Sequence, residues 1–541
     1  MSKRLILVTC ALIMGCSHGL AYDLIIKNAR IIDGTGAPWF RGDVAITSRT
    51  VAAVGVLEEG STAPRVIEAA DRYVAPGFID VHTHCEDDLL TMPAAENFVR
   101  MGVTSIISGN CGSSYTNLAE AFTSHTAKGI GINFASLLGQ GTIRRKVVGN
   151  VRREATTTEV AAMQEIIERG MRAGAVGMST GLIYTPGTYT KTEEIAELAK
   201  AVGKYHGVYA SHMRSEGTNI TEAINEALSI GKAGNCPVEI SHFKITSPRR
   251  FGQSTHTVQM VEDARAAGQD VTVDQYVYTA SSTGISTMLP DWANEGTSEA
   301  VKARLTDPTS RALILKSIIE ERKSSGRPNM DYAHVTSFRP DPTINGKSLL
   351  EIAKKWKDSD SWEAQAAVVV DIVTSGGSGM VFHSMDEKDV QNIAQYHNSM
   401  FASDSGVREF GNGVPHPRGY GNNARVLARY VRDIKLLRLE DAIRKMTSLP
   451  ARTFRFMDRG ILRPGMAADL VVFDLERVND PATFEDPHHY AEGFDWVLVN
   501  GEPVIADGKL TGARSGQILR GPGYRAEAEA HELDEAQKEK Q

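Results

Sequence analysis

The sequence predicts an α/β protein, in which a closed (β/α)8 TIM-like barrel carries a small β-sandwich domain built from both termini. Three observations support this prediction. Short apolar strands alternate with amphipathic helices through the middle of the chain, this unit occurs eight times, and both ends of the chain are rich in strand patterns. With 541 residues, the chain is long enough for one large and one smaller domain.

The first 21 residues have the pattern of a secretory signal peptide. A basic start precedes an apolar run over residues 5–14, which is too short to span a bilayer as a mature helix. Two processing sites compete: cleavage after Ala21, which we favour, and lipidation of Cys16 at an imperfect lipobox. Both predict an exported protein, periplasmic or secreted, without a transmembrane span. Only the second adds a lipid anchor.

Composition limits the kinds of partner and of cross-link. The net charge is −7, from 59 basic and 66 acidic residues, and no basic stripe is present, which argues against a nucleic-acid partner. Beyond the signal segment the cysteines are Cys85, Cys111 and Cys236, too few for a disulfide framework. Metal binding is one explanation for a free thiol in an exported protein.

Strand patterns near both ends predict one β-domain made of residues 22–74 and 455–523. In the first part, short runs of Ile, Leu and Val are separated by turns such as the one at residues 33–36. The same pattern returns in residues 469–473 and 496–501. Because two β-rich ends flank a different middle, we expect them to assemble together.

The barrel is predicted over residues 75–454. Capping-box patterns at Thr156-x-x-Glu159 and Thr190-x-x-Glu193 open two of its helices. The eight strands end at or near residues 84, 111, 138, 180, 212, 242, 275 and 404. Regular alternation of strand and helix predicts parallel strands, and eight units favour a closed barrel over an open sheet.

Residues from about 287 to 379 interrupt this alternation. Their charged helical segments predict an insertion before the last barrel strand, and the sequence is equally consistent with a lid over the site and with a surface excursion. The last residues, 524–541, are charged and almost free of apolar side chains, so we expect a disordered tail.

Residue types that bind metals follow the barrel strands at their carboxyl ends, where a barrel of this kind places its active site. These residues are His82 and His84 after strand one, Cys111 after strand two, His212 after strand five, His242 after strand six and Asp404 after strand eight. The two-residue spacing of His82 and His84 puts both side chains on one face of the strand, so that they can share one metal.

Each of these residues alone is weak evidence, since a single histidine or cysteine is more often structural than a ligand. Four histidines at matching strand ends together predict a metal site, and imidazole and thiolate are ligands that suit zinc. Asp404 has two interpretations, either a further ligand or a carboxylate that relays a proton beside the metal. We favour the proton relay.

Several motifs resemble the amidohydrolase superfamily and, within it, the D-aminoacylases, or N-acyl-D-amino-acid deacylases. The opening Val74-Ala75-Pro76-Gly77-Phe78-Ile79-Asp80-Val81-His82-Thr83-His84 is similar to the start of the superfamily barrel. The narrower resemblance rests on residues 109–112, 139–144, 179–187, 211–217, 241–244, 403–404 and 416–418. It extends from about residue 22 to residue 523.

The resemblance implies a tightly held zinc on Cys111, His212 and His242, with His82 and His84 forming a second, weaker position. It also implies that Asp404 is the catalytic acid and base. The residues expected to hold the substrate carboxylate or the polarised carbonyl are Lys244, Tyr184, Tyr276, Ser282 and Arg418.

The chain departs from the family pattern at two positions. The usual Tyr-Pro-Tyr is Tyr276-Val277-Tyr278 here, which leaves open which tyrosine points inward, and Gln140 stands where a histidine is common. The first departure affects a substrate contact, and the second affects a local hydrogen bond and not the metal.

The activity that the resemblance implies is hydrolysis of a small N-acyl-D-amino acid to a carboxylate and a free D-amino acid. One alternative is a cyclic amide hydrolase of the hydantoinase or dihydroorotase type, which usually bridges two metals with a carboxylated lysine. The strand at residues 176–180 ends without a lysine, and Cys111 is the bridging candidate. The other alternative, a catalytically silent barrel, is disfavoured because the full set of ligands is present.

Overall fold

The computed structural model describes residues 20–527 and 533. The predicted signal segment, including Cys16, lies outside the described residues except for its last two positions, and so does most of the predicted tail from residue 528 onward. Within the described part of the chain, no helix is both long and apolar enough to cross a membrane.

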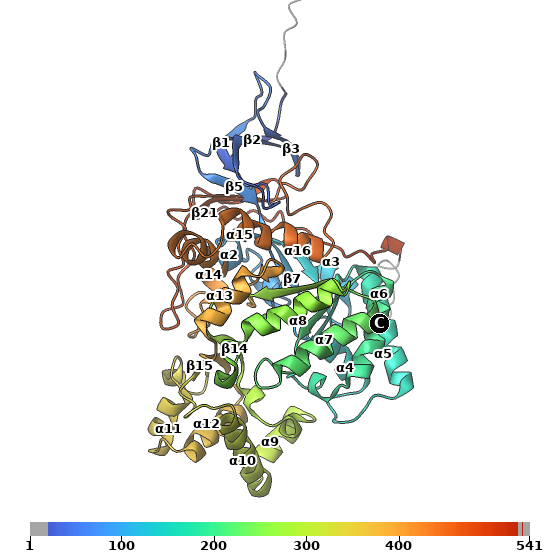
Figure 1. Cartoon of the computed structure of the whole chain (residues 1–541), viewed down its shortest axis with the longest axis vertical. Coiled ribbons are helices and arrows are strands. Elements are labelled where there is room, and N and C mark those ends of the chain that lie inside the picture. Colours follow the sequence, from blue (N-terminus) through green and yellow to red (C-terminus); the bar gives the residue numbers. More distant parts are fainter. Residues whose placement is uncertain (1–19, 528–532, 534–541) are drawn as a thin grey trace, which may run out of the picture.

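One nine-stranded sheet contains strands from both ends of the chain (Figure 1). Its neighbours run in the order β21-β20-β19-β18-β5-β1-β2-β3, and β4 pairs with β1. The strands are β1 (Leu24–Ile31), β2 (Phe40–Thr47), β3 (Thr50–Gly55), β4 (Arg65–Glu68), β5 (Tyr73–Pro76), β18 (Leu470–Phe473), β19 (Phe494–Val499), β20 (Glu502–Ala506) and β21 (Lys509–Leu510). The antiparallel pair of β5 and β18 joins the N-terminal strands to the C-terminal ones.

The apolar residues that predicted these strands form the core beneath the sheet. Ile26 and Ile31 of β1 are fully buried in one cluster with Val44 of β2 and with Leu470 and Val472 of β18. Burying side chains of this size is favourable by roughly 1.5–3 kcal/mol each. The two ends of the chain therefore share one hydrophobic core.

The middle of the chain contains parallel strands in two sheets. The first consists of β6 (Phe78–Asp80), β7 (Val103–Ser108) and β8 (Asn133–Ser136), and the second of β9 (Leu138–Gly139), β10 (Gly177–Gly181), β11 (Val208–His212), β12 (Val238–Ile240), β13 (Val271–Gln275) and β17 (Ser399–Phe401). Backbone contacts join the two sheets at both edges, because Val176 N–H donates to Ser136 at 3.0 Å and Thr83 forms a parallel bridge with Ser405. The predicted α/β architecture with parallel strands is therefore confirmed.

Helices follow the parallel strands and pack against one another around them (Figure 1). They include α3 (Leu118–Lys128), α4 (Gln140–Val147), α5 (Thr157–Ala173), α6 (Thr192–Lys204), α7 (Ile220–Gly234), α8 (Ser254–Ala266), α13 (Glu387–Gln395), α14 (Arg418–Arg425) and α15 (Leu439–Met446). The capping box predicted at Thr156 and Glu159 is confirmed. The one predicted at Thr190 is wrong: α6 begins two residues later, and the Thr190 hydroxyl instead accepts a hydrogen bond from Gln140 at 3.1 Å.

Between β13 and β17 the chain leaves the parallel sheet and forms a separate unit at the end of the molecule opposite the nine-stranded sheet (Figure 1). An antiparallel sheet of β14 (Ser281–Gly284), β16 (Gly379–Phe382) and β15 (Ala333–Ser337) is accompanied by α9 (Ser298–Thr306), α10 (Pro308–Ser324), α11 (Leu349–Lys357) and α12 (Trp362–Thr374). This unit buries its own apolar cluster, which includes Ile314, Val335 and Val369. Its regular structure begins at Ser281 and ends at Phe382, slightly wider than the predicted 287–379.

Candidate metal centre and active site

A cavity of about 1270 Å³ opens at the carboxyl ends of the parallel strands. Every predicted site residue except His82 lines it, namely His84, Cys111, Tyr184, His212, His242, Lys244, Tyr276, Ser282, Asp404 and Arg418. His82 lies just beneath the floor and is fully buried. The inserted unit contributes Met288, Leu289 and Tyr332 to the wall, so it borders the cavity and is not a distant surface excursion.

Three predicted ligands surround one point on the cavity floor. The Sγ atom of Cys111 lies 3.4 Å from Nδ1 of His212 and 3.6 Å from Nε2 of His242. The two histidine nitrogens are 2.8 Å apart. Residues from three separate strand ends thus direct one sulfur and two ring nitrogens toward a common position.

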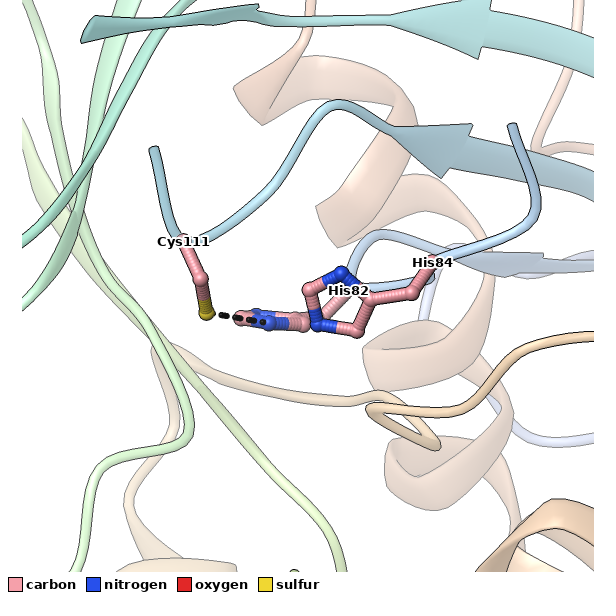
Figure 2. Close-up of side chains that lie close together, drawn as sticks. All are labelled: His82, His84 and Cys111. Atoms are coloured by element: carbon pink, nitrogen blue, oxygen red, sulfur yellow. Dashed lines mark hydrogen bonds between the residues drawn. The ribbon is translucent and has the colours of Figure 1, made fainter. Parts of the chain in front are cut away.

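His82 and His84 extend this cluster toward Asp404. Nε2 of His82 lies 3.3 Å from Sγ of Cys111, and Figure 2 shows both histidine rings reaching from one strand end toward the sulfur. Oδ1 of Asp404 lies 3.3 Å from Nε2 of His84 and 3.7 Å from Nε2 of His82. The ligand atoms therefore form three overlapping groups: Cys111 belongs to two of them, and the third joins Asp404 to His82 and His242.

The backbone at these strand ends explains how the side chains turn into the cavity. Cys111, His242 and Asp404 all have positive φ, at 52°, 37° and 50°. Such angles are uncommon outside glycine and cost of order 1–3 kcal/mol each, so they persist only where surrounding contacts impose them. Three residues with strained backbone angles thus lie at the carboxyl ends of three strands, and all three line the cavity.

Electrostatics favour ionised groups on the cavity floor. Burial raises the pKa of the Cys111 thiol, but nearby His82 and His212 outweigh this effect and hold the pKa well below its usual range. Burial also opposes ionisation of Asp404, but Arg418 and His82 keep the pKa of that carboxyl well below its usual range. A thiolate and a carboxylate beside imidazoles are the donor types that a borderline-soft divalent cation requires.

Both predicted cations near this floor have acidic partners. Nζ of Lys244 lies 2.6 Å from Oε1 of Glu216, and Nη1 of Arg418 lies 2.9 Å from Oδ2 of Asp404. The Arg418 guanidinium also stacks over Tyr276, with its central carbon 4.5 Å from the ring centre. The Tyr276 hydroxyl and the Arg418 Nε are buried and have no hydrogen-bond partner among the described residues. These two donors are free to bind a ligand.

The structure answers which tyrosine points inward. Tyr276 lines the cavity, whereas the Tyr278 hydroxyl points away and donates to Asp480 at 2.7 Å. The Tyr184 hydroxyl lies 2.9 Å from the hydroxyl of Thr283, next to Ser282 on β14. The inserted unit thus places Ser282 and Thr283 at the cavity.

Two acids at the site, the half-buried Glu216 and the buried Asp274, were missed by the sequence analysis. Glu216 lies 2.8 Å from Nδ1 of His242, and Lys244 and His242 lower the pKa of Glu216 to about 2 although its burial opposes this. Asp274 lies 3.1 Å from Nδ1 of His82. The available signal for Asp274 was an acidic residue inside an otherwise apolar strand, Val271-Thr272-Val273-Asp274.

Comparison with known proteins identifies the class. The model of the amidohydrolase family matches residues 65–323 and 397–505. The chain therefore belongs to the amidohydrolase family. Between the two matched segments, residues 324–396 are unmatched, and they comprise the second part of the inserted unit together with α13.

Within that family, relatives of nearly full length are deacylases of D-amino acid derivatives. D-aminoacylase of Alcaligenes xylosoxydans xylosoxydans is 34% identical over 94% of this chain and 99% of the relative. N-acyl-D-glutamate deacylase of the same organism is also 34% identical, over 92% and 96% of the two chains. Since both values are equal, overall identity does not distinguish their substrate preferences.

Solved structures agree with this placement. A D-aminoacylase structure described with a binuclear metal centre has a TM-score of 0.79 and 34% identity, and covers 92% of this chain and 100% of that chain. N-acyl-D-glutamate deacylase from Bordetella bronchiseptica, complexed with zinc and a phosphonate inhibitor, has a TM-score of 0.77 and 32% identity, and covers 93% and 100% of the chains. An L-hydantoinase structure has a TM-score of only 0.52 and 18% identity, and this likeness shows the fold alone.

Proposed function

We propose that the protein is a zinc-dependent hydrolase that cleaves the amide bond of N-acyl-D-amino acids. The observation that carries the proposal is the convergence of Cys111, His212 and His242 on one point of a cavity floor, 3.4–3.6 Å from sulfur to nitrogen. The nearly full-length relatives that act on such substrates support the choice of a linear amide with a D-configured amino acid.

The residues present fit zinc. Thiolate and imidazole are its usual ligands, and the low pKa of Cys111 provides the thiolate. Cys111, His212 and His242 hold the tightly bound ion, while His82 and His84 form the second, weaker position beside the shared sulfur. When bound, zinc supplies Lewis-acid chemistry, which polarises the amide carbonyl and makes water acidic enough to attack at neutral pH.

The protein side chains supply the proton transfer. Asp404 has one oxygen tied to Arg418, and its other oxygen, Oδ1, faces the histidine cluster. That oxygen accepts a proton from the attacking water and returns it to the amide nitrogen as the carbon–nitrogen bond breaks. The acyl group leaves as a carboxylate and the amine as a free D-amino acid.

Substrate binding is assigned to the remaining residues on the cavity wall. The unpartnered donors of Arg418 and Tyr276 bind the α-carboxylate, and Lys244 adds a second positive charge nearby. Tyr184 and Ser282 complete the wall on the side of the polarised carbonyl.

The finer fold and the location of the protein belong to this proposal. We infer that the parallel strands close into a (β/α)8 barrel over residues 75–454, supported by the backbone contacts at both sheet edges. Residues 22–74 and 455–523 form a β-sandwich domain around their common core. The signal pattern in residues 1–21 supports export to the periplasm or beyond, with lipidation of Cys16 as the alternative to plain cleavage.

The proposed activity is tested on zinc-loaded protein with three substrates. We expect hydrolysis of N-acetyl-D-methionine, at least about 100-fold slower hydrolysis of its L-enantiomer, and no ring opening of dihydrouracil, because the site lacks a bridging lysine. Zinc content is measured on the same sample. Ring opening without deacylation would favour the cyclic amide hydrolase, and bound zinc without either activity would contradict both enzymes.

The carboxylate site gives a second prediction. Arg418→Lys keeps the charge but removes the planar fork, so we expect kcat/KM for N-acetyl-D-methionine to fall about 10- to 100-fold, as for the loss of a charge-assisted hydrogen bond. For N-acetyl-D-methioninamide, which lacks the carboxylate, kcat/KM of the same variant should fall much less. Arg145→Lys is the control, since Arg145 lines the cavity but binds the carbonyl of Thr185. Equal losses on both substrates would remove Arg418 from the carboxylate site.

A further inference from the structure

Asp274 is a fully buried carboxylate beneath the floor of the cavity. It lies on β13, two residues before Tyr276, and does not line the cavity itself. Its two oxygens serve two different metal-binding residues: Oδ2 lies 3.1 Å from Nδ1 of His82, and Oδ1 accepts a hydrogen bond from the backbone N–H of His242 at 2.9 Å. One acid thus contacts a ligand of each of the two proposed metal positions.

The contact with His82 determines which ring nitrogen can bind a metal. A carboxylate can only accept hydrogen bonds, so it requires the proton of the neutral imidazole to be on Nδ1. The lone pair is then on Nε2, the nitrogen that faces Sγ of Cys111 at 3.3 Å and Oδ1 of Asp404 at 3.7 Å. Carboxylates that hold metal-binding histidines in this way also fix the ring orientation.

The contact with His242 acts on the backbone. His242 has a φ of 37°, a strained angle for a residue with a side chain. The Asp274 carboxylate accepts the N–H of this same residue, and the His242 ring receives its own support on Nδ1 from Glu216 at 2.8 Å. Asp274 therefore holds the backbone of His242 in place, whereas it determines which ring nitrogen of His82 carries the proton.

We propose that Asp274 is a positioning residue that fixes the Nδ1–H tautomer of His82, so that Nε2 is available to the second, weaker metal position. The inference rests on the metal ligands of the proposed function. It assigns to the strand that follows His242 a role in controlling the second ion, although Asp274 touches neither substrate nor the cavity.

The isosteric substitution Asp274→Asn makes a specific prediction. If the amide oxygen keeps the His242 N–H, the amide NH2 faces Nδ1 of His82 and selects the tautomer with its proton on Nε2, which cannot bind a metal. If the amide turns over, its NH2 opposes the N–H of His242. Asp274→Ala places no donor beside His82 and leaves its tautomer free. The positioning role therefore predicts a larger effect of Asn than of Ala, the reverse of what loss of packing predicts.

The two substitutions are compared by metal titration. Zinc is added to the metal-free, full-length proteins in the presence of a competing chelator, and the affinity for each ion is measured. We expect Asp274→Asn to weaken binding of the second ion at least about tenfold, Asp274→Ala to weaken it less, and both to retain the first ion. Asp389→Asn is the matched control, because Asp389 is also buried and accepts backbone N–H groups, from Gly252 and Ser254. Unchanged binding of the second ion in Asp274→Asn, or a larger loss in Asp274→Ala, would overturn the proposal.

Nitrogen NMR provides a readout that needs neither metal nor activity. In the metal-free protein with 15N-labelled histidine, recorded at a pH where the His82 ring is neutral, the signal of His82, assigned by its absence in His82→Gln, should show a protonated Nδ1. In Asp274→Asn it should shift to a protonated Nε2. A His82 ring that carries no proton on Nδ1 in the unmodified protein would refute the inference directly. Failure of the proposed function is distinguishable, since it would appear as absent deacylation by the zinc-loaded unmodified protein while the tautomer signal stays as expected.

Discussion

Replacing Asp404 with asparagine is expected to lower kcat for N-acetyl-D-methionine by about 10²- to 10⁴-fold, the range that general acid–base catalysis contributes. The bound zinc should stay near its level in the unmodified protein. Asparagine has the shape of aspartate but cannot take up the proton that the departing nitrogen needs. The measurement is steady-state kinetics on protein whose zinc content is determined in parallel.

The geometry explains why zinc should remain. The Oδ1 atom of Asp404 lies 3.3 Å from His84 and 3.7 Å from His82, the two residues of the weaker position. The carboxylate also lies within ligand distance of His242, but Cys111, His212 and His242 converge without it. In the proposed site, the tight position consists of these three residues and does not require Asp404. Loss of the tightly bound ion in Asp404→Asn would instead make Asp404 a principal ligand, and the proton relay would need another residue.

Asp291→Asn is the matched control for this variant. Asp291 lines the outer part of the same cavity, where its carboxylate accepts a hydrogen bond from the Thr188 hydroxyl at 2.7 Å. The substitution removes the same charge from the same cavity without touching the metal-binding cluster. We expect kcat to change by less than about threefold, because the amide oxygen of asparagine can still accept this hydrogen bond. A loss as large as that of Asp404→Asn would indicate a general dependence on negative charge.

Much of this site could be predicted from the sequence because strand ends are a local property. An apolar strand followed by His, Cys or Asp indicates a side chain at the rim, and regular alternation with helices indicates that the rims coincide. Cys111, His212 and His242 were found in this way, although more than 100 residues separate the first from the last. Because the topology is regular, residues recognised one by one at strand ends can be predicted to lie close together in space.

The contacts behind the ligands could not be predicted, because they depend on pairing between distant strands. Asp274 lies 192 residues from His82, and Glu216 lies 28 residues from Lys244. A buried acid could equally hold backbone N–H groups of a neighbouring segment, as Asp389 on α13 does. Lys244 was expected to face the substrate freely, and only the folded chain shows that Glu216 compensates its charge.

Local signals also failed where a tertiary contact competes with them. Thr190 and Glu193 have the spacing of a capping box, but the Thr190 hydroxyl accepts from the buried Gln140 and the helix starts at Thr192. Gln140, where the resemblance leads one to expect a histidine, thus makes the contact that replaces the cap. The capping box at Thr156 formed as predicted, because no buried partner competes for its hydroxyl.

Replacing Cys111 with serine is expected to have the largest effect on the metal centre. A serine hydroxyl does not ionise near neutral pH and is a poor ligand for zinc, whereas the Cys111 thiol has a pKa well below its usual range. Because the sulfur belongs to two of the three groups of ligand atoms, this one substitution should disturb both positions. We expect zinc retained after dialysis against a chelator to fall below about a tenth of that in the unmodified protein, and deacylation to fall to background.

Cys236→Ser separates this effect from the general cost of burying a hydroxyl. Cys236 is a buried free thiol whose pKa is raised to about 12 by burial, and its sulfur lies 3.9 Å from the carbonyl of Gly231. Its replacement should therefore leave zinc content and turnover unchanged, at the expense of roughly 1 kcal/mol of stability. If Cys111→Ser kept its zinc and its activity while remaining folded, the sulfur would not be a ligand. The convergence of three strand ends on it would then need an explanation other than a metal.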